Sequence, residues 1–433
     1  MVQAVWSTAH GHPLRVTDLQ GEQISRLAAH VDPILVLLAP LWWLWPSPVM
    51  LLTVQAVAVA LGALPVFWLA RKHLGSERAA FGFALAYLLY PAVQWQTLNE
   101  FHPVALATPL LLFALWYLDE DRLWAFAAFG VAAALCKEEI PLVLAAFGAW
   151  YALARRRVLP GAVIAVLGVA ATAIAVGLVI PHFNEGASSA FYGRYDEVGG
   201  SPGGILRTAF TDPLTLLRVA FDERGVDYLA ALLLPLALLC LGAPVTLVAA
   251  PELAINLLSA TPTQTSIHFH YTAGAIPGLV AGSVLGAAAL ERRRRGLAVP
   301  LAAVAVLAAL IGNYRLGPIP LWRELPGGET LQAYSTHVSD HDRAAARAIE
   351  LIPDDVVVSA TNSLGAHLSE RERVLSFPYI RDATWVAADE TQPGYADRIA
   401  PLPTAVRLAR LRRNPSWRLV FAEDGVLVFR RVR

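Results

Sequence analysis

Long apolar runs separated by short polar links dominate the first three quarters of the chain. The runs are about 15 to 23 residues long, the length at which an α-helix crosses much or all of a bilayer. This pattern predicts a polytopic α-helical membrane protein. We expect about ten spanning helices, at Val49–Ala70, Ala79–Trp95, Val104–Leu118, Leu123–Leu135, Ile140–Ala154, Val158–Ile180, Tyr228–Leu241, Pro244–Leu258, Tyr271–Leu290 and Leu297–Tyr314.

The chain before the first of these runs is too polar to span, apart from the short apolar run Ile34–Trp45. Its three tryptophans suit the headgroup level of a membrane. We therefore expect residues 1–47 to form interfacial helices, with a short span at Ile34–Trp45 as the alternative. Residues 48–316 then form the transmembrane bundle, which a long external loop at 181–226 interrupts.

After Gly317 the pattern changes to short apolar strands and amphipathic helices. Residues 317–433 therefore predict a small α/β domain outside the membrane. Helices are expected at Asp340–Leu351, Ser363–Ser369 and Thr404–Arg412, and strands at Val356–Ser359, Val374–Phe377, Thr384–Ala388, Trp417–Glu423 and Gly425–Arg430.

Composition agrees with the membrane class, because the chain is 56% hydrophobic and only 16% charged, with a mean hydropathy of +0.50. Its formal net charge is zero, so no basic field indicates a nucleic-acid partner. Three basic clusters, Arg71–His73, Arg155–Arg157 and Arg292–Arg295, fall on one side if every candidate span crosses. The positive-inside rule makes that side cytoplasmic, which leaves the N-terminal helices, the long loop and the C-terminal domain extracytoplasmic.

Two polar patches fall on that extracytoplasmic side. Lys137, Glu138 and Glu139 stand together between two uncharged apolar runs, and Asn99–Pro103 separates two others. A charge deep in a bilayer costs roughly 2.5–3.5 kcal/mol on insertion scales. Such charges must face a watery cavity or each other, and we expect both patches to open over one site.

Several runs resemble those of a known family. They are residues 39–48 (Ala-Pro-Leu-Trp-Trp-Leu-Trp-Pro-Ser-Pro), residues 94–103 with their Glu-Phe-His-Pro, Lys137–Pro141 and Ser266–Tyr271. As a set they resemble the bacterial and archaeal membrane family known as domain-of-unknown-function family 2079, up to about Tyr314 and more weakly beyond it. That family in turn resembles the GT-C superfamily of glycosyltransferases. The resemblance implies a multi-pass enzyme of the bacterial cytoplasmic (inner) membrane that uses polyprenyl-phosphate sugars at its extracytoplasmic face.

The chain departs from the GT-C pattern at its start. GT-C enzymes carry an acidic residue just after their first spanning helix, whereas Met1 opens directly on what resembles the first external loop. We expect the first helix and its Asp to lie upstream of Met1. Asp32 is the nearest available carboxylate, although helix capping explains it equally well. Arg26 and His30 lie near the same interfacial helix and are candidate substrate-binding residues.

Glycosyl transfer from a lipid phosphate requires a group that accepts the acceptor's proton and a cation that stabilises the leaving phosphate. Lys137 is the candidate phosphate contact, and a snorkelling lysine paired with a neighbouring glutamate is the structural alternative. Glu138 and Glu139 are adjacent on a helix and cannot both face one way. We expect one to face the cavity and the other to pair with Lys137.

Two pairs of residues are candidates for acid–base or metal chemistry. Glu100 and His102 converge if their link is extended, which Pro103 favours; interfacial polarity is the alternative. His268 and His270 share one face if the segment around Phe269 is extended. They could ligate a divalent metal or bind phosphate, but this spacing is a weak metal signal and a solvated loop explains it equally well.

The remaining candidates are Glu252 and Tyr271. Glu252 lies within an apolar run and is costly unless it is paired or faces water. Tyr271 directly follows His270 in one of the runs that carry the family resemblance. No cofactor is required with certainty, although a divalent metal would fit the Glu and His pairs.

The leading hypothesis is a membrane-embedded glycosyltransferase that moves a sugar from a polyprenyl-phosphate donor to an extracytoplasmic acceptor, in contact with membrane lipids. A transporter or flippase for a lipid-linked or anionic solute is the first alternative, because intramembrane charges also mark transport paths. The absence of an evident inverted repeat argues against it. A non-catalytic membrane scaffold is the second alternative. The sequence identifies neither the sugar nor the acceptor, a protein partner or the oligomeric state.

Overall fold

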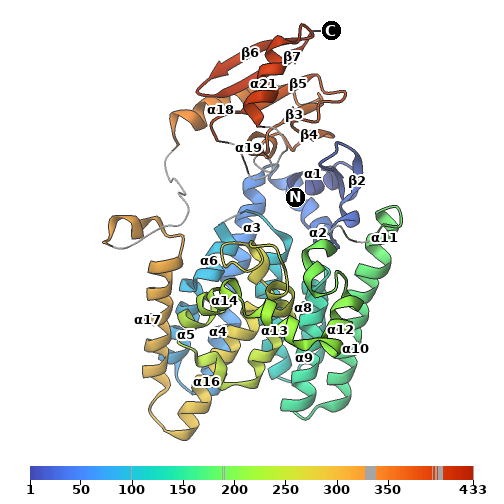
Figure 1. Cartoon of the computed structure of the whole chain (residues 1–433). Helices are drawn as coiled ribbons and strands as arrows, with labels where there is room; N and C mark the ends of the chain where they lie inside the picture. Colours follow the sequence, from blue (N-terminus) through green and yellow to red (C-terminus); the bar gives the residue numbers. More distant parts are fainter. Residues whose placement is uncertain are drawn as a thin grey trace. The chain divides into compact units, whose positions relative to one another are not determined.

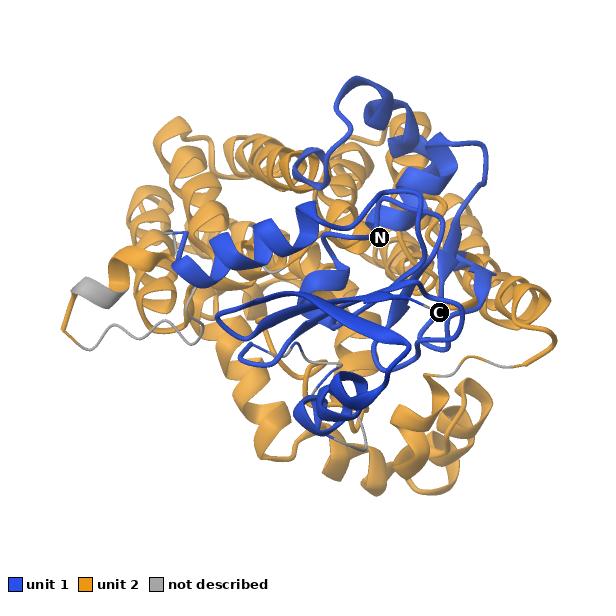
Figure 2. Cartoon of the chain, turned by 90° about the horizontal axis from the view of Figure 1, so that it is seen from above, with its two compact units in different colours: residues 1–26, 35–50, 335–433 blue, residues 27–34, 51–334 orange. Residues whose placement is uncertain are grey.

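The computed structural model describes residues 1–98, 100–187, 189, 191–326, 338–392, 394, 397 and 403–432. Asn99, part of one predicted polar patch, lies outside them. The chain divides into two compact units, which Figure 2 shows in different colours. Unit 1 comprises Met1–Arg26, Leu35–Met50 and Ser335–Arg433, and unit 2 comprises Leu27–Ile34 and Leu51–Tyr334. The three-part division expected from the sequence stays a prediction.

Unit 2 is a bundle of helices, seen end-on in Figure 2. Three described segments are long and apolar enough to cross a membrane, namely Pro48–Leu74, Val158–Phe183 and Ala298–Leu316. The other apolar helices are shorter, so the number of crossings stays a prediction. The main helices, many of them labelled in Figure 1, are α3 (Pro48–Leu61), α4 (Ala63–Leu74), α5 (Glu77–Leu89), α6 (Pro91–Leu98), α7 (Ala107–Asp119), α8 (Leu123–Ala134), α9 (Ile140–Ala154), α10 (Val158–Ile174), α16 (Ile276–Arg293) and α17 (Ala298–Leu316).

Some predicted spans are broken in the structure. The predicted span Tyr228–Leu241 is wrong as one helix, because α14 (Glu223–Leu233) gives way to two short 3-10 turns around Ala237 and Leu238. Both residues have positive φ angles, which a continuing α-helix does not allow. The predicted span Ala79–Trp95 breaks at Tyr90, whose extended backbone precedes Pro91. Two more predicted spans differ at their starts, since Pro244–Ala249 is a 3-10 turn before α15 (Ala250–Leu257) and α16 begins only at Ile276.

The predicted external loop at 181–226 contains short helices of its own. They are α11 (Ile180–Phe183), α12 (Pro202–Thr211), α13 (Pro213–Ala220) and the start of α14. A polar side chain caps each of the last three, since Ser201, Asp212 and Asp222 accept hydrogen bonds from backbone N–H groups of the first turn. Such caps satisfy N–H groups that a helix start leaves without intrahelical partners.

Glycines hold α9 and α10 at short range. A Cβ atom on Gly148 would lie 2.5 Å from the carbonyl oxygen of Gly161, and one on Gly168 would lie 2.4 Å from that of Pro141. Only glycine fits at such distances, as in other close-packed membrane helices. One turn after Gly168, the Thr172 hydroxyl donates to the backbone oxygen of Glu138 at 2.9 Å. The close packing therefore places α10 beside the predicted polar patch at the start of α9.

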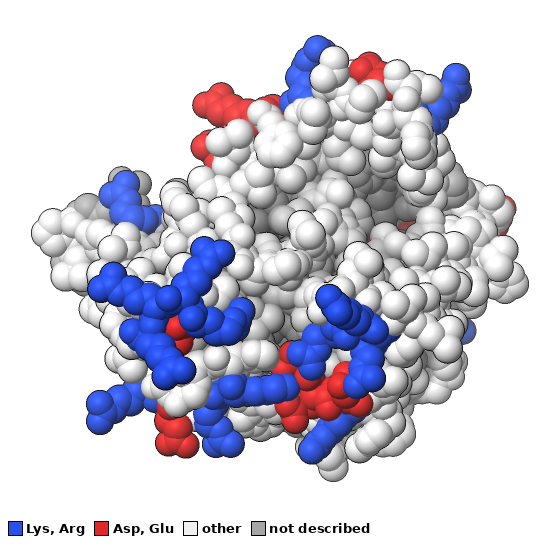
Figure 3. Space-filling view, turned by 90° about the horizontal axis from the view of Figure 1, so that it is seen from below, with Lys and Arg blue, Asp and Glu red and all other residues white. Residues whose placement is uncertain are grey.

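Basic side chains gather at the other end of α9. Arg155, the C-terminal cap of α9, lies 3.3 Å from the carboxylate of Asp119 at the end of α7, and Lys72 of α4 lies 2.7 Å from it. Figure 3 shows the Lys and Arg side chains clustered on the face seen from below, where α16 also turns into α17 in Figure 1. Because α9 has 15 residues, its two ends lie about 22 Å apart. The basic end and the Lys137 end of the bundle are therefore distinct.

The C-terminal part of unit 1 is a five-stranded sheet with helices on both faces. The strand order is β4-β3-β5-β7-β6, with β3 parallel to β4 and β5, and β7 antiparallel to β5 and β6. The strand and helix predictions for this part are confirmed to within a few residues at each end. The elements are α18 (Asp340–Glu350), β3 (Val358–Ala360), α19 (Asn362–Gly365), β4 (Val374–Ser376), β5 (Trp385–Asp389), α21 (Thr404–Arg413), β6 (Trp417–Glu423) and β7 (Val426–Arg431).

Alternating side chains divide this sheet between two cores. Trp385 and Ala387 of β5 pack with residues of α18 and α19, whereas Val386 and Ala388 pack with Leu408 of α21. Successive side chains of a strand point to opposite faces, so the four apolar residues Trp385–Ala388 of β5 serve both layers. This burial explains why the first four residues of β5 form a continuous apolar run.

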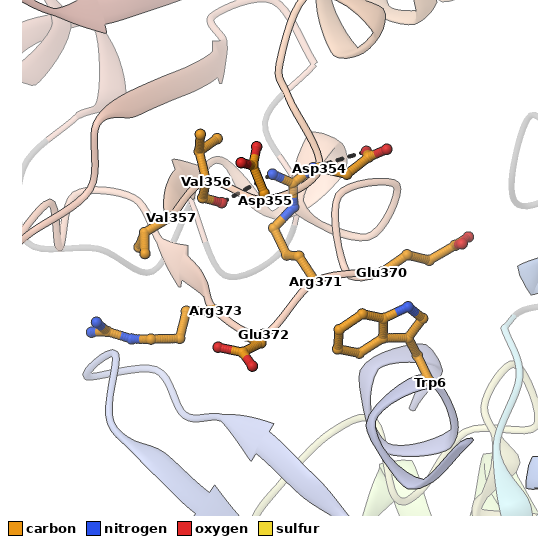
Figure 4. Close-up of a pocket in the computed structure, with 9 residues that line it drawn as sticks. All are labelled: Trp6, Asp354, Asp355, Val356, Val357, Glu370, Arg371, Glu372 and Arg373. Atoms are coloured by element: carbon orange, nitrogen blue, oxygen red, sulfur yellow. Dashed lines mark hydrogen bonds and ion pairs between the residues drawn. The ribbon is translucent and has the colours of Figure 1, made fainter. Parts of the chain in front are cut away.

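The N-terminal part of unit 1 contains α1 (Val2–Ala9), the hairpin of β1 (Arg15–Thr17) and β2 (Gln23–Ser25), and α2 (Ile34–Leu44). Gln3 of α1 donates hydrogen bonds to the backbone oxygens of Arg371 and Glu372, at 3.1 and 3.0 Å. The two sequence-distant parts of unit 1 are thus joined by hydrogen bonds. Beside this junction lies a hollow of about 570 Å³, drawn in Figure 4.

Arg371 braces the wall of that hollow. Its guanidinium is buried and donates to the backbone oxygens of Leu368, Pro353 and Val356, at 2.6, 2.9 and 3.2 Å. Figure 4 shows it reaching toward Asp354 and the oxygen of Val356. These bonds tie the segment after α18 to the segment before β4. Arg371 therefore stabilises the fold of unit 1.

Candidate functional site

The candidate site lies in unit 2, at the end of the bundle where α9 begins. Glu138, in the link between α8 and α9, accepts hydrogen bonds from Nδ1 of His30 at 2.8 Å and from the backbone N–H of Val31 at 2.9 Å. The backbone N–H of Ile34 donates to the oxygen of Leu135 at 3.0 Å. The segment His30–Ile34 therefore lies along the link that carries Glu138. Asp32, which is 1% exposed, falls between these two anchors.

Glu138 and Glu139 face different partners, as their adjacency requires. Lys137 Nζ forms an ion pair with Oε1 of Glu139 at 2.6 Å and lies 5.3 Å from the centre of the Tyr271 ring. Burial disfavours the Lys137 ammonium, but the charges of Glu139 and Glu138 outweigh burial and raise the pKa of Lys137. Burial likewise raises the pKa of Glu138, but His30 and Lys137 outweigh it and hold this pKa well below its usual value. Both groups are therefore charged near neutral pH.

A second cluster joins Glu100, His102 and His270. His102 has extended backbone, as expected for the residue before Pro103, and its Nδ1 lies 3.6 Å from Oε1 of Glu100. Its ring stacks on that of His270, with centroids 3.5 Å apart. One ligand atom from each of the three residues lies within 4.8 Å of the others. Two imidazoles and one carboxylate are a donor set that suits zinc and leaves a coordination position open.

The two clusters are continuous through Tyr271. The ring of His270 lies 4.3 Å from the Tyr271 ring, centroid to centroid, and Lys137 lies over the same Tyr271 ring. The structure thus brings together residues from four distant parts of the chain. Their roles in catalysis or binding stay predictions.

Glu252 of α15 approaches the same region. Glu252 is 2% exposed, and a Cβ atom on Gly274 would lie 2.9 Å from its Oε2. Among the described residues this Oε2 has no hydrogen-bond partner. One turn later, Asn256 donates to the backbone oxygen of Tyr271 at 2.7 Å, which ties α15 to the site. A buried carboxylate oxygen without a partner is costly, and a substrate hydroxyl would satisfy it.

His268 lies outside the cluster of Glu100, His102 and His270. His268 contacts the Trp95 ring and bonds to the Ser266 hydroxyl at 2.8 Å, whereas only His270 joins the His102 cluster. The two rings pack against different neighbours, because a 3-10 turn begins at His270. The role of His268 stays a prediction. Arg26 belongs to unit 1, and its role stays a prediction.

Sequence reasoning missed two residues that shape the site. Gln55 of α3 is fully buried; its Nε2 donates to the backbone oxygens of Gln96, Thr97 and Glu100, and its Oε1 accepts from the N–H of His102. A glutamine inside an otherwise apolar helix was the available signal. Arg194 lies 4.4 Å over the Phe191 ring, which stacks on His30. Its only signal was a polar and aromatic stretch in the long loop.

A family model described as "Predicted membrane protein (DUF2079)" matches residues 1–428. The chain belongs to the DUF2079 family. No curated protein matches it significantly.

Among solved structures, this DUF2079 chain is similar to ArnT from Cupriavidus metallidurans bound to undecaprenyl phosphate. The TM-score is 0.52 at 13% sequence identity, over 99% of this chain and 92% of ArnT. The apo state of the same ArnT gives a TM-score of 0.49 at 14% identity, with the same coverage. Such low identity shows the fold alone. The resemblance to GT-C enzymes is confirmed at that level.

For a DUF2079 protein, this arrangement offers three kinds of chemistry. Lys137 provides positive charge for an anion. Arg194 provides a second positive charge, and it is linked to the site because it lies over the Phe191 ring, which stacks on His30. Asp32, Glu100 and Glu252 provide carboxylates that can accept a proton or a hydroxyl hydrogen bond. The imidazoles of His102 and His270 add proton acceptors or metal ligands.

Proposed function

We propose that this chain is a membrane-embedded glycosyltransferase that moves a sugar from a polyprenyl-phosphate donor to an extracytoplasmic acceptor. The observation that carries the proposal is the position of Lys137 next to the N-terminus of α9, with carboxylates and imidazoles from distant segments around it. A helix N-terminus and an ammonium both favour a phosphate. The fold likeness to ArnT, which was crystallised with undecaprenyl phosphate, supports a lipid-linked donor.

The proposed step exchanges one bond at the anomeric carbon of the sugar. The acceptor hydroxyl oxygen bonds to that carbon, and the bond between the carbon and the phosphate oxygen breaks. Polyprenyl phosphate leaves with the electron pair, and Lys137 stabilises the charge that develops on it. The hydroxyl proton passes to a carboxylate or an imidazole of the protein.

The contacts distinguish the candidate bases. Both oxygens of Glu138 already accept hydrogen bonds, and its pKa is low. Glu138 is therefore better suited to orient the His30 ring than to accept a proton. Glu100 is exposed and lies beside His102, so a base there can exchange its proton with solvent. We assign the base to the Glu100–His102 pair and keep Asp32 as the alternative. Glu252 would accept a hydrogen bond from the substrate.

A divalent cation fits this proposal. Carboxylates outnumber cations around Lys137, since Glu138, Glu139 and Glu252 all influence it. Glu100, His102 and His270 would hold the ion. When bound, it would supply positive charge near the leaving phosphate. With the ion bound, Glu100 and His102 would be ligands, so the alternative base Asp32 would take the proton, and Lys137 would still position the donor.

The proposal places the site on the extracytoplasmic side. His102 precedes the 3-10 turn that leads into α7, and Lys137 precedes α9. The charges of Asp119 and Arg155 lie at the other ends of these two helices. The basic end faces the cytoplasm by the positive-inside rule. The C-terminal domain would then be extracytoplasmic as well.

The test is a transfer assay on the purified full chain in lipid nanodiscs. Undecaprenyl-phosphate sugars labelled in the sugar are offered with an extract of envelope acceptors, and both the labelled product and released undecaprenyl phosphate are measured. The proposal expects the two in equal amounts. Movement of the intact donor across a sealed vesicle, with no bond broken, would instead support the transporter hypothesis.

A further inference from the structure

A pocket of about 440 Å³ lies at the basic end of unit 2, away from the candidate site. Its walls come from the second half of α4, the last turn of α7 and the turn before α8. They include Trp68, Arg71, Lys72, Trp116, Tyr117 and Arg122. The pocket therefore combines cations with large aromatic rings, and neither the family nor the proposed reaction accounts for it.

Positive side chains outnumber negative ones in this pocket. Three cationic side chains and one carboxylate, that of Glu120, line it, which gives a net charge of +2. Lys72 is held at the base of the pocket, because its Nζ contacts Oδ2 of Asp119 at 2.7 Å and Oε1 of Glu120 at 2.6 Å. The single carboxylate is therefore already neutralised. The pocket keeps an excess of positive charge.

Two guanidinium groups remain available for a ligand. Arg122 is exposed and forms no ion pair among the residues that the structure describes. Arg71 has one distant partner, Glu77 at 3.8 Å, and both of these side chains are exposed. An exposed pair of this kind contributes little and is easily replaced. Arginine also matches phosphate oxygens with two parallel hydrogen bonds.

The aromatic walls indicate what kind of phosphate this pocket suits. The rings of Trp68 and Trp116 lie 5.9 Å apart, and the Lys72 ammonium lies 5.6 Å from the Trp116 ring. Trp116 stands in the last turn of the apolar helix α7, the position at which Trp and Tyr meet lipid headgroups, and Trp68 lies one turn before the basic end of α4. Both rings are half-buried. A soluble phosphate would leave their exposed parts to water, whereas the glycerol and first acyl carbons of a lipid would cover them.

We propose that this pocket binds the phosphate headgroup of an anionic phospholipid. Arg71 and Arg122 hold the phosphate, Lys72 neutralises the nearby carboxylates of Asp119 and Glu120, and the rings of Trp68 and Trp116 cover the adjoining carbons. Basic pockets between membrane helices on the cytoplasmic side bind lipid headgroups in this way. Figure 3 shows the basic face on which such a lipid would lie.

Native mass spectrometry of the detergent-solubilised full chain tests this proposal. Dioleoyl-phosphatidylglycerol is titrated against dioleoyl-phosphatidylcholine, and the first bound lipid is counted. We expect phosphatidylglycerol to bind preferentially. Arg122→Gln and Arg71→Gln should each weaken it about fivefold, since each basic side chain near a membrane surface contributes to headgroup binding by about that factor.

Matched variants separate a pocket from diffuse surface charge. Arg292→Gln removes one exposed charge from the same basic end but outside the pocket and should leave the binding unchanged. Trp116→Leu should weaken binding, whereas Trp124→Leu should not, because Trp124 is 79% exposed and lies outside the pocket. The melting temperature of each variant without added lipid confirms that it is folded.

Two outcomes would overturn the proposal. If Arg292→Gln weakened phosphatidylglycerol binding as much as Arg122→Gln, the preference would come from general surface charge. If glycerol 3-phosphate displaced the lipid at equal concentration, the pocket would be a site for a soluble phosphate. Both readouts are independent of glycosyl transfer.

Discussion

The imidazole rings of His102 and His270 stack with their centroids 3.5 Å apart and their planes inclined by 18°. His102 precedes α7 and His270 precedes α16, so two distant segments of the chain meet at this contact. Glu100 lies beside the pair. The contact gives the candidate site a place where a proton or a metal ion can be held between segments that sequence alone does not connect.

We predict that His270→Ala and His102→Ala each weaken the binding of Zn²⁺ or Mn²⁺ to the full chain by about tenfold or more, because each removes one of three donors. Isothermal titration of the metal-free protein measures this. His268→Ala should bind the metal as the wild type does, since His268 lies outside the donor group. A loss of affinity in His268→Ala alone would contradict this assignment.

Removal of metal from the full chain should lower the rate of transfer if the ion offsets the carboxylates around Lys137. The measurement is the transfer rate after chelation and after re-addition of Mn²⁺ or Zn²⁺. Rates that chelation leaves unchanged, in a protein shown to be metal-free, would assign the phosphate charge to Lys137 and Arg194 alone.

The buried Gln55 should contribute strongly to the stability of unit 2, although we assign it no part in proton transfer. Gln55→Leu would leave the backbone groups of Gln96, Thr97, Glu100 and His102 without their partner. We expect a loss of about 3 kcal/mol or more, since each unsatisfied buried group costs about 1–3 kcal/mol. Thermal unfolding in detergent measures it, with the exposed Val57→Ala on the same helix as the control. Equal melting temperatures for both variants would refute the role of Gln55.

Arg371 should stabilise unit 1 through its three backbone hydrogen bonds. We predict that Arg371→Met lowers the stability of unit 1 by about 2–4 kcal/mol, because it removes charge-assisted bonds and leaves carbonyl oxygens unsatisfied. Hydrogen–deuterium exchange of β3 and β4 in the full chain reports this change. Arg410→Met, an exposed arginine of α21, is the control and should exchange as the wild type does.

The sheet of unit 1 should depend on pH through His341. Its Nε2 lies 2.9 Å from Oδ2 of Asp389 and its Nδ1 lies 3.2 Å from Oδ2 of Asp424. Burial lowers the pKa of His341, but the hydrogen bond and charge of Asp389 outweigh burial and raise it above 6.5. The pKa of Asp389 is lowered, because its hydrogen bonds outweigh burial, so it stays ionised.

A raised histidine pKa stabilises the fold fully below the unfolded value of about 6.5 and loses this effect as the pH rises through the folded value. We therefore predict that His341→Gln speeds hydrogen exchange in β5 and β7 more at pH 6 than at pH 9, after correction for intrinsic exchange. An effect of the same size at both pH values would show that the imidazole acts only by packing.

The sequence predicted where most helices and strands lie, but it predicted less well where a long apolar run is broken into separate helices. Apolar runs marked most helices, and strict strand patterns marked β5, β6 and β7. The break at Tyr90 was visible in the following Pro91, whereas the turns at Ala237 and Leu238 depend on packing that an apolar run does not reveal. The distribution of arginines indicated which helix ends lie together, and the ion pairs of Asp119 with Lys72 and Arg155 join two of those clusters.

Part of the candidate site could be predicted for a clear reason. Charges such as Lys137 and Glu139 are too costly among apolar runs to lack partners, so their pairing followed from the sequence. The contact between His30 and Glu138 did not, because many polar residues could have filled that position. Gln55 and Arg194 were missed, since glutamine carries no charge and Arg194 stands in a long loop where polar residues are ordinary.

The most direct test of the account is the rate of sugar transfer by Lys137 variants of the full chain. Lys137→Gln keeps the length of the side chain but removes the charge, and Lys137→Arg keeps the charge. Arg218→Gln, an exposed position on α13, serves as the control. We predict that Lys137→Gln lowers the rate about a hundredfold or more, as loss of a group that stabilises developing charge does. Lys137→Arg should retain part of the rate and Arg218→Gln all of it. Transfer by Lys137→Gln at the wild-type rate would contradict the account.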